Sequence, residues 1–338
     1  MSVTLKDVSL RTGISKSVIS MYLNKDTRVR VGKKKKKIID KVVKEMNYRP
    51  SRMACSLRKQ QSNMLGLVVG GITDPFFSRL VEALLKYVED LGYQLLISLT
   101  SWDEHKEMKC LETLLERQVD GVIYAPRFPD EEKFQEKIRR NGTPVILMNR
   151  KIDLFPAVCQ NPEKSFNDMC HTLYDAGCRE LFCPQHPYED TIDFLSKLCK
   201  SHGIKPRPLA CETPDEAVKM ILKRTPEYIF IANCWTIKAL LKKIKEQQLD
   251  YHPKFVTYYN FPVDLIEDEG LAGVIFGHPY SYMKAVVDYL IDLIENKKSG
   301  NPQESGIRLL DVSFFTRQEF LQCKNSLEDT FSSSNNIS

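Results

Sequence analysis

The feature that most constrains the fold of this chain is a series of strands and helices that alternate from residue 64 onward. Apolar runs such as LGLVV, GVIYA and PVILM recur in units of about 25 to 30 residues, and each run is followed by a helical segment. The alternation starts again after about residue 161. This pattern predicts two lobes, each a doubly wound α/β domain with a parallel sheet, whose ligands bind beyond the carboxyl ends of the strands.

The individual elements follow from the apolar runs and from the periodicity between them. The expected strands are residues 65–69, 93–99, 121–125, 144–148, 180–184, 228–233, 254–259, 273–277 and 308–315. The expected helices are residues 74–91, 103–117, 131–140, 163–176, 191–201, 215–222, 236–247 and 280–295. The final polar stretch, SLEDTFSSSNNIS, is expected to be disordered.

The N-terminal stretch TLKDVSLRTGISKSVISMYLN has a different pattern, which predicts two short helices around a tight turn. Thr4 is suited to cap the first helix, Gly13 to end it in a left-handed conformation, and Ser15 to cap the second. The apolar residues form a shared seam, made by Leu5, Val8, Val18, Ile19 and Leu23. Opposite this seam lie Lys16, Ser17, Ser20 and Met21. A helix-turn-helix presents such a surface to a DNA major groove, although an amphipathic hairpin in any small domain could show the same spacing.

Charge is distributed unevenly along the chain. Residues 1–60 hold 17 lysines and arginines against 4 aspartates and glutamates, so the remainder carries −8 within a total net charge of +5. Five lysines, residues 33–37, begin a third expected helix, residues 32–46, where they oppose the helix dipole. The inner side of this helix is expected to consist of Ile38, Ile39, Val42, Val43 and Met46. DNA phosphates would explain the lysines, although such a run is often only a solvated surface.

The basic segment that follows, NYRPSRMACSLRKQQ, is expected to be a hinge. Pro50 begins a helix of about two turns in which Met53 and Leu57 share one side, and such a helix is too short to be stable alone in water. Burial against its copy in a dimer would stabilise it. Leu57 could then enter the DNA minor groove as a wedge, with Arg58 beside it. The alternative is a basic tether between domains.

Several classes of protein are disfavoured by the sequence. No apolar stretch is long enough to span a membrane and no signal peptide follows Met1, so the chain is expected to be cytoplasmic. The ten cysteines include no C-x-x-C pair, which favours reduced thiols over a metal site or a disulfide framework. The G-x-G-x-x-G, P-loop, G-x-S-x-G and HExxH signatures are absent, so no catalytic residue, metal or cofactor is assigned.

Several segments together resemble the LacI/GalR family of bacterial transcription regulators. They are TLKDVSLRTGISKSVISMYLN, NYRPSRMACSLR, LGLVVGGITDPFFSRLVEAL, LLERQVDGVIYAP and TPVILMNR, and the resemblance runs from residue 4 to about residue 319. It implies an α/β protein with an N-terminal helix-turn-helix headpiece and a hinge helix. It also implies a two-lobed periplasmic-binding-protein-like core of doubly wound parallel sheets, which dimerises and binds a small effector.

The resemblance implies domain boundaries as well. The headpiece is expected at residues 1–48, the hinge helix or linker at 49–61, the core at 62–324 and a disordered tail at 325–338. Within the core, lobe 1 is expected at about residues 62–160 and 279–308, and lobe 2 at about residues 161–278 and 309–324. Each lobe is therefore built from separate stretches of the chain.

The DNA-contacting residues that the resemblance implies lie in the headpiece and the hinge. They are Thr4, Ser15, Lys16, Ser17, Met21, Asn24, Tyr48, Ser51, Met53, Ala54, Leu57 and Arg58. Lys16, Ser17 and Met21 match the base-reading positions, and Leu57 matches the intercalating leucine. Met21 stands where the family commonly has arginine or histidine, and Cys55 where it commonly has arginine. Methionine has no strong donor for guanine, so an altered choice of operator is expected.

The resemblance places the effector between the lobes. The residues it implies are Phe76, Phe77, Asn149, Arg150, Thr191, Asn233 and Tyr259. Where the family commonly has an arginine and two aspartates, this chain has Thr191, Cys234 and Tyr259. The pocket is therefore expected to be less charged and more aromatic, with Tyr258 as a further stacking face. We expect an effector unlike the simple hexoses or purines of well-known relatives, or no tight effector.

Ordinary roles remain open for some of these residues. Phe76 and Phe77 could belong to the core, and Arg150 could form a surface ion pair. At the level of the whole protein, the favoured function is a DNA-binding transcription regulator, expected to be a repressor. Its partners would be double-stranded operator DNA, a small-molecule effector and a second copy of the chain, with no membrane. Carbohydrate catabolism is the default for the family.

The alternative function is a solute-binding protein or a sugar-processing enzyme on the same core fold. It requires an export signal or catalytic carboxylates in the cleft. It also leaves the basic residues 1–60 unexplained, which is why the regulator is favoured.

Overall fold

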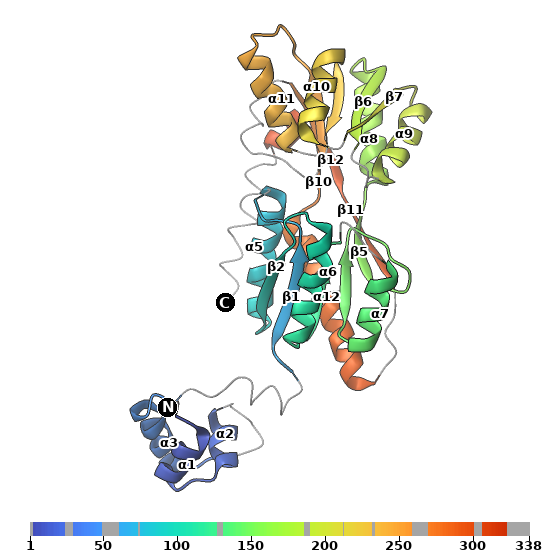
Figure 1. Cartoon of the computed structure of the whole chain (residues 1–338). Helices are drawn as coiled ribbons and strands as arrows, with labels where there is room; N and C mark the ends of the chain where they lie inside the picture. The colour runs from blue at the N-terminus through green and yellow to red at the C-terminus, as the bar shows by residue number, and fades with distance from the viewer. Residues whose placement is uncertain are drawn as a thin grey trace. The chain divides into compact units, whose positions relative to one another are not determined.

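The structure is a computed structural model of the whole chain. It describes residues 3–23, 30–48, 61–73, 75–126, 131–185, 190–211, 213–231, 234–258, 270–300 and 306–322. The chain divides into two compact units, residues 1–63 and 64–338, which we call the headpiece and the core and describe separately (Figure 1). Within the described ranges, no helix is long and apolar enough to cross a membrane.

The headpiece contains helices α1 (Leu5–Thr12), α2 (Lys16–Leu23) and α3 (Lys33–Glu45). Its buried centre is made by Val8, Ile14, Ile19, Ile39 and Val42. The remaining residues of the expected seam, Leu5, Val18 and Leu23, pack against this centre. The prediction that Ile38 lies on the inner side of α3 is wrong, because its side chain is 46% exposed. One step along a helix turns a side chain by about 100°, so Ile38 faces solvent while Ile39 is buried.

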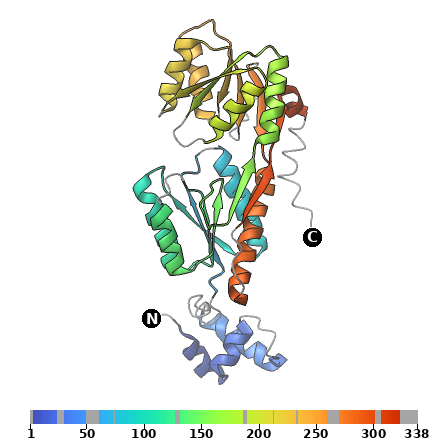
Figure 2. The same ribbon diagram turned by 90° about the vertical axis from the view of Figure 1, so that its right-hand side faces the viewer.

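Lobe 1 of the core is a parallel sheet with helices on both faces (Figure 2). Its strands are β1 (Met64–Val69), β2 (Gln94–Leu99), β3 (Gly121–Tyr124), β4 (Val145–Met148), β5 (Ala157–Asn161) and β11 (Ile307–Asp311). They lie in the order β11-β5-β4-β3-β1-β2. Helices α5 (Pro75–Asp90) and α12 (Pro279–Ser299) cover one face, and α6 (Glu104–Glu116) and α7 (Glu131–Asn141) cover the other.

Lobe 2 repeats this arrangement. Its strands are β6 (Glu180–Gln185), β7 (Lys205–Ala210), β8 (Tyr228–Ile231), β9 (Lys254–Tyr258), β10 (Leu271–Phe276) and β12 (Ser313–Thr316), in the order β12-β10-β9-β8-β6-β7. All paired strands are parallel except β12, which is antiparallel to β10. Helices α8 (Glu163–Asp175) and α9 (Asp190–Ser201) cover one face, and α10 (Pro214–Arg224) and α11 (Cys234–Glu246) the other. The predicted fold class is confirmed.

Strands β5 and β7 were not among the expected strands. The sequence of β5 is AVCQN, a run too short and too polar at its end to stand out as a strand. Strand β7 contains Pro206 and Pro208, which argue against a strand unless it lies at an edge. Strand β7 lies at an edge of the lobe 2 sheet. Lys205, which precedes Pro206, donates its backbone N–H to Arg179 O at 2.8 Å, so every second residue of β7, starting at Lys205, directs its N–H toward β6. The prolines therefore occupy positions that need no donor toward β6.

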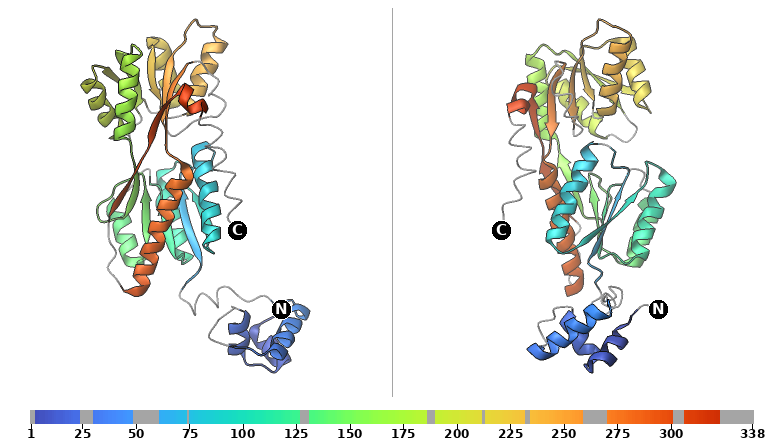
Figure 3. Two further views of the ribbon diagram at one scale, coloured as in Figure 1. Left: turned by 180° about the vertical axis from the view of Figure 1, so that it is seen from behind. Right: turned by 90° about the vertical axis from the view of Figure 1, so that its left-hand side faces the viewer.

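Within the described residues, the chain passes between the lobes in three segments, which join β5 to α8, β10 to α12, and β11 to β12 (Figure 3). The expected strand 308–315 is thus two strands, one in each sheet, divided at the buried Val312. These segments meet at Gly277. A Cβ atom there would come within 2.7 Å of Gln160 Nε2 and 2.8 Å of Val312 Cγ1. The missing side chain allows the segments to pack together.

This topology decides where a ligand site can form in the core. Strand β5 leaves lobe 1 at its carboxyl end, and β10 leaves lobe 2 at its carboxyl end. The other parallel strands of each sheet run in the same direction, so their carboxyl ends also border the connecting segments. The loops after these strands are therefore the candidate effector region.

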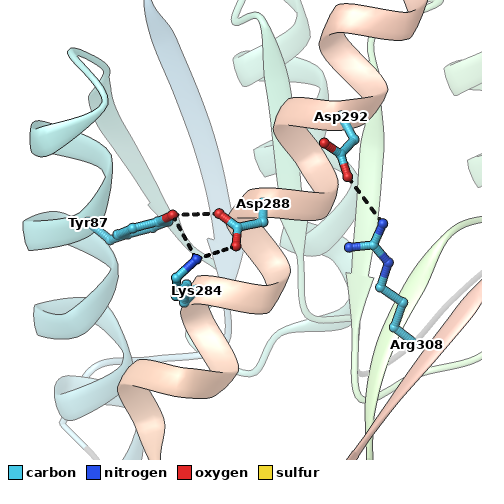
Figure 4. A network of polar contacts seen from close by, with 5 residues as sticks. All are labelled: Tyr87, Lys284, Asp288, Asp292 and Arg308. Atoms are coloured by element: carbon cyan, nitrogen blue, oxygen red, sulfur yellow. Dashed lines mark hydrogen bonds and ion pairs between the residues drawn. The ribbon is translucent and has the colours of Figure 1, made fainter.

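A polar network joins α5 to α12 on the covered face of lobe 1 (Figure 4). Tyr87 OH donates to Asp288 Oδ1 at 2.5 Å, and Lys284 Nζ donates to Asp288 Oδ2 at 2.6 Å and to Tyr87 OH at 3.2 Å. One turn further along α12, Asp292 pairs with Arg308 of β11 at 3.2 Å. Burial by itself would raise the pKa of Asp288, but the hydrogen bonds from Lys284 and Tyr87 outweigh it and lower that pKa.

We predict that Asp288→Asn lowers the free energy of unfolding by about 1 kcal/mol near pH 7 and by less at acid pH. A carboxylate with a lowered folded-state pKa stabilises the fold above its unfolded pKa of about 3.9. This contribution is lost as the pH falls through the folded-state pKa. Urea unfolding at pH 7 and pH 3 measures it. Asp292→Asn, in a more exposed pair, is the control and should cost less; an equal loss from both substitutions would contradict the prediction.

Candidate nucleic-acid interface and effector site

The first helix of the headpiece is fixed at both ends. Thr4 is its N-cap residue, and its backbone N–H and hydroxyl donate to Asp7 Oδ2 at 2.9 and 2.7 Å. The Thr4 hydroxyl and backbone bonds lower the pKa of Asp7. At the other end Gly13 has φ 68° and donates to Ser9 O at 3.0 Å. The predicted cap and left-handed turn are both present.

Side-chain hydrogen bonds hold the turn between α1 and α2, and sequence reasoning did not anticipate them. Ser9 Oγ donates to Ile14 O at 2.7 Å, and Thr12 Oγ1 donates to Val8 O at 2.8 Å. Thr12 Oγ1 also accepts from Ile14 N at 3.2 Å. These bonds satisfy backbone groups that a tight turn would otherwise leave unpaired. They fix the direction in which α2 leaves α1.

The side of α2 opposite the buried Ile19 forms the candidate reading surface. Ser15, Lys16 and Ser17 are exposed at the start of the helix, and Met21 is half-buried one turn later. The structure thus brings the first three of these candidate residues together on an open surface. The fourth lies closer to the core.

The start of α3 carries the exposed lysines 33–37. A hollow beside α2 is lined by three of these lysines and four further residues. They are Lys33, Lys34, Lys35, Val18, Arg30, Val31 and Gly32. Lys36 Nζ lies 5.6 Å from the centroid of the Tyr22 ring. Tyr22 OH donates to Asp40 at 2.9 Å, which ties α2 to α3. Burial and this bond raise the pKa of Tyr22.

Of the other DNA-contact candidates, the structure describes Tyr48 but not the hinge residues or Asn24. Tyr48 is half-buried against the headpiece core, and its backbone N–H donates to Val43 O at 3.0 Å. The remaining candidates, Asn24, Ser51, Met53, Ala54, Leu57 and Arg58, lie outside the described residues.

In lobe 1, the candidate effector residues follow β1 and β4. Phe77, in the first turn of α5, is half-buried and meets Trp102 edge to face, with ring centroids 5.6 Å apart. Phe76 belongs to α5, but its side chain lies outside the described part of the structure. Sequence reasoning missed Trp102, although an aromatic residue three positions after the end of the expected strand 93–99 is a signal that could have indicated it.

Asn149 and Arg150 stand at the carboxyl end of β4 and have different environments. Asn149 has φ 51°, and its Oδ1 accepts from Gln160 N at 3.0 Å, so the side chain braces the β4–β5 loop. Arg150 is half-buried, and within the described ranges it forms no ion pair. The ordinary role considered for Arg150, a surface ion pair, is therefore not seen among these residues.

In lobe 2, Thr191 lies in α9, but its side chain is outside the described residues, as are Asn233 and Tyr259. The expectation that Tyr258 offers a stacking face is wrong. Its side chain is 6% exposed and packs in the core, 5.4 Å from the Phe166 ring and 6.3 Å from the Phe230 ring by centroid. The alternation of β9 points it into the sheet–helix layer instead of the loop region.

Four buried cysteines share the core of lobe 2: Cys170, Cys178, Cys183 and Cys199. The Cys170 and Cys199 sulfurs are 3.8 Å apart, and burial raises the pKa of Cys178 to about 12. Thiols in such surroundings pack as small apolar side chains. Among the residues that the structure describes, no group of three or more His, Cys, Asp or Glu side chains could hold a metal ion.

Comparisons with known proteins agree with this architecture. The family described as "Bacterial regulatory proteins, lacI family" matches residues 4–51, and "Periplasmic binding proteins and sugar binding domain of LacI family" matches residues 62–184. The chain is 31% identical over 150 residues to the catabolite repressor/activator of Escherichia coli strain K12, covering 44% of this chain and 45% of that protein. It thus spans about half the length of the curated relatives that it matches.

Solved structures show the same fold across more of the chain. A lac repressor dimer bound to operator and the anti-inducer ONPF has a TM-score of 0.78 at 19% identity, covering 94% of this chain and 99% of that one. A Cra regulator from Pseudomonas putida in complex with fructose 1-phosphate has a TM-score of 0.64 at 16% identity, covering 75% and 98%. The chain belongs to the LacI family of bacterial regulatory proteins.

At Met21 we predict weak discrimination of guanine. A thioether can pack on a thymine methyl group, but it cannot make the bidentate bond of arginine, worth about 1–3 kcal/mol. Selection from a random DNA pool should show little guanine preference at the facing base pair, and Met21→Arg should sharpen it. Leu10→Arg, on a 74% exposed position of α1, adds the same charge as a control and should leave base preference unchanged. Strong guanine preference in the unmodified protein would contradict the prediction.

Proposed function

We propose that this protein is a sequence-specific DNA-binding transcription regulator whose core binds a sugar-like effector. The observation that carries the proposal is the headpiece: a helix-turn-helix whose second helix exposes Lys16 and Ser17 beside the lysine-rich start of α3. Such a surface supplies base-edge contacts from one helix and phosphate contacts from the next. A regulator of this kind would act in the cytoplasm, most simply as a repressor.

The hollow between α2 and α3 supports contacts to the DNA backbone. The N-terminus of α3 directs backbone N–H groups outward, and Arg30, Lys33, Lys34 and Lys35 surround it. Both features attract an anion, whereas the lysines alone are unfavourable at a helix start. A DNA phosphate beside α2 would use both.

The hinge function remains a proposal from sequence. Residues 49–60 lie outside the described part of the chain, so the hinge helix and the minor-groove wedge Leu57 rest on the family pattern. We expect a pseudo-palindromic operator of roughly 14 to 20 base pairs, because two copies of a headpiece bind two half-sites about one helical turn apart.

We propose that the chain acts as a homodimer through β2 and α5 of lobe 1. Strand β2 is a sheet edge, and its Ile97 and Leu99 are 38% and 41% exposed. Leu85 in α5 and Leu91 just after it are 38% and 43% exposed. An apolar edge strand beside an apolar helix is a surface that a second copy would cover. The dimeric state of the lac repressor named above is consistent with this arrangement.

For the effector, we propose a sugar or sugar phosphate bound at the carboxyl ends of the strands. The half-buried Arg150 at the end of β4 supports an anionic or strongly polar group on the ligand. The P. putida relative binds fructose 1-phosphate, which combines a ring and such a group. The alternative of a solute-binding protein shares the core fold, but it provides no use for the headpiece.

The function is tested by Lys34→Gln combined with Lys36→Gln. We predict weaker binding to all DNA. The slope of log affinity against log salt concentration should also be smaller by about two, because binding releases one counterion fewer from the DNA for each lysine removed. Lys242→Gln with Lys243→Gln in α11 makes the same charge change within the core and should alter neither. Fluorescence anisotropy at several salt concentrations measures both. If residues 61–338 alone bound operator as tightly as the whole chain, the DNA-binding function would be wrongly assigned to the headpiece.

The dimer surface makes a separate prediction. Ile97→Glu should shift the protein from dimer to monomer in sedimentation at micromolar concentration and lower operator affinity, because it places a charge in an apolar contact. Leu309→Glu is the matched control: Leu309 is 55% exposed on β11, the opposite edge of the same sheet. Dissociation by Leu309→Glu and not by Ile97→Glu would place the interface at the other edge.

A further inference from the structure

The carboxyl ends of β1 and β2 carry an apolar, aromatic surface of which the family resemblance assigns only Phe77. It consists of Ile72, Phe77 and Trp102. Ile72 and Trp102 are each 41% exposed, and Phe77 is half-buried with its ring edge to face against the indole. We call these three residues the aromatic corner of lobe 1.

The backbone is arranged to hold the indole of Trp102 in this place. A Cβ atom at Gly70 would lie 2.2 Å from Trp102 Cε3 and Cζ3, so only glycine leaves room for the ring beside β1. Ser101 and Trp102 both have left-handed backbones, with φ 55° and 62°. Trp102 N donates to Thr100 Oγ1 at 3.3 Å. Two consecutive non-glycine residues in this region are costly, and such conformations gather at ligand sites.

Along the same edge of the lobe 1 sheet, the residues that follow β4 are polar. Arg150 and the exposed Asn149 follow β4, and β3 and β1 lie between β4 and β2 in the sheet. The lobe 1 side of the effector region is therefore asymmetric, with an apolar aromatic end and a cationic end. A ligand that satisfies both ends needs an apolar face on one part and a polar or anionic group on another.

We propose that Trp102 is an effector-contacting residue that, with Phe77, selects a cyclic sugar-like ligand by its apolar C–H face. A sugar ring laid against an indole buries apolar area while its hydroxyls remain free to reach polar groups. Stacking therefore avoids the cost of an unpaired hydroxyl, and Arg150 orients the polar end. The proposal rests on the proposed function, in which the core binds a sugar-like effector.

A different occupant of the aromatic corner is a second copy of the chain, because Leu99 precedes it on the exposed edge strand. The direction of the strand favours the ligand. The corner follows the carboxyl ends of β1 and β2, which border the segments between the lobes, whereas Ile97 and Leu91 lie further back on the side of the sheet. The oligomeric state distinguishes the two occupants.

The test uses the full chain with Trp235→Phe, which leaves Trp102 as the sole tryptophan, since the chain has two. The protein is titrated with fructose 1-phosphate, fructose and cellobiose while the indole emission is recorded. We expect at least one sugar to change the emission saturably. In an otherwise native chain, calorimetry should show that Trp102→Ala weakens this sugar at least tenfold and Trp102→Phe less.

Two further variants distinguish the effect of displacing the Trp102 indole from the effect of removing it, and control for the loss of apolar surface. Gly70→Ala keeps the indole but forces it out of its place, and should weaken the sugar as Trp102→Ala does. Leu309→Ala removes an equally apolar exposed side chain at the opposite edge of the sheet and should leave sugar affinity unchanged. Operator binding without sugar and the dimeric state should be the same in all these variants.

Three results would overturn the proposal: unchanged sugar affinity in Trp102→Ala, dissociation of the dimer by that substitution, or no binding of any of the three sugars. The first leaves the regulator and its effector function standing and removes only the role of Trp102. The second assigns the aromatic corner to the dimer. The third, with operator binding intact, removes the sugar effector but not the DNA-binding function.

Discussion

The contact of three chain segments around Gly277 is the constraint on which the core depends. Gln160 and Val312 approach this residue so closely that a Cβ atom would not fit. Further bonds brace the same region: Tyr282 OH donates to Val158 O at 2.9 Å, and Asn149 Oδ1 accepts from Gln160 N. Because the strands are parallel, this junction places the carboxyl ends of both sheets at one border. A candidate effector residue, Asn149, is thereby part of the junction itself.

The headpiece is a small unit that few residues stabilise. Its apolar centre is small, and polar bonds complete it: Ser9 and Thr12 close the turn, and Tyr22 holds α3 through Asp40. The lysines at the start of α3 are exposed and lie outside the apolar centre, although Lys36 Nζ is 5.6 Å from the centroid of the Tyr22 ring. Repulsion among its charges and with the helix dipole is tolerated, and binding of a polyanion would relieve it. Buried apolar side chains of these helices thus stabilise the fold, and exposed side chains of the same helices are available for the proposed DNA binding; Thr4 is both a helix cap and a DNA-contact candidate.

In the core, the structure and the sequence indicate different aromatic residues as ligand contacts. The family resemblance suggested stacking faces in both lobes, from Phe76 and Phe77 and from Tyr258 and Tyr259. Of these, Tyr258 is buried between Phe166 and Phe230. Among the described residues at the strand ends of the core, Trp102 of lobe 1 exposes aromatic surface, and Tyr259 lies outside the described residues. Arg150 is half-buried at the end of β4, without an ion pair among the described residues. An effector with one apolar and one polar side fits this distribution better than a uniformly polar one.

The sequence by itself determined the helix-turn-helix, the two doubly wound lobes and the caps at Thr4 and Gly13, because these depend on local periodicity and local backbone preference. Tertiary structure alone decided the rest. The prolines of β7 are compatible with a strand only at a sheet edge, and residues 308–315 divide because each half pairs with a different lobe. Trp102 becomes a candidate ligand contact only when Gly70, thirty-two positions earlier in the chain, lies beneath its ring. Such contacts join residues distant in sequence, and no pattern within a single segment specifies them.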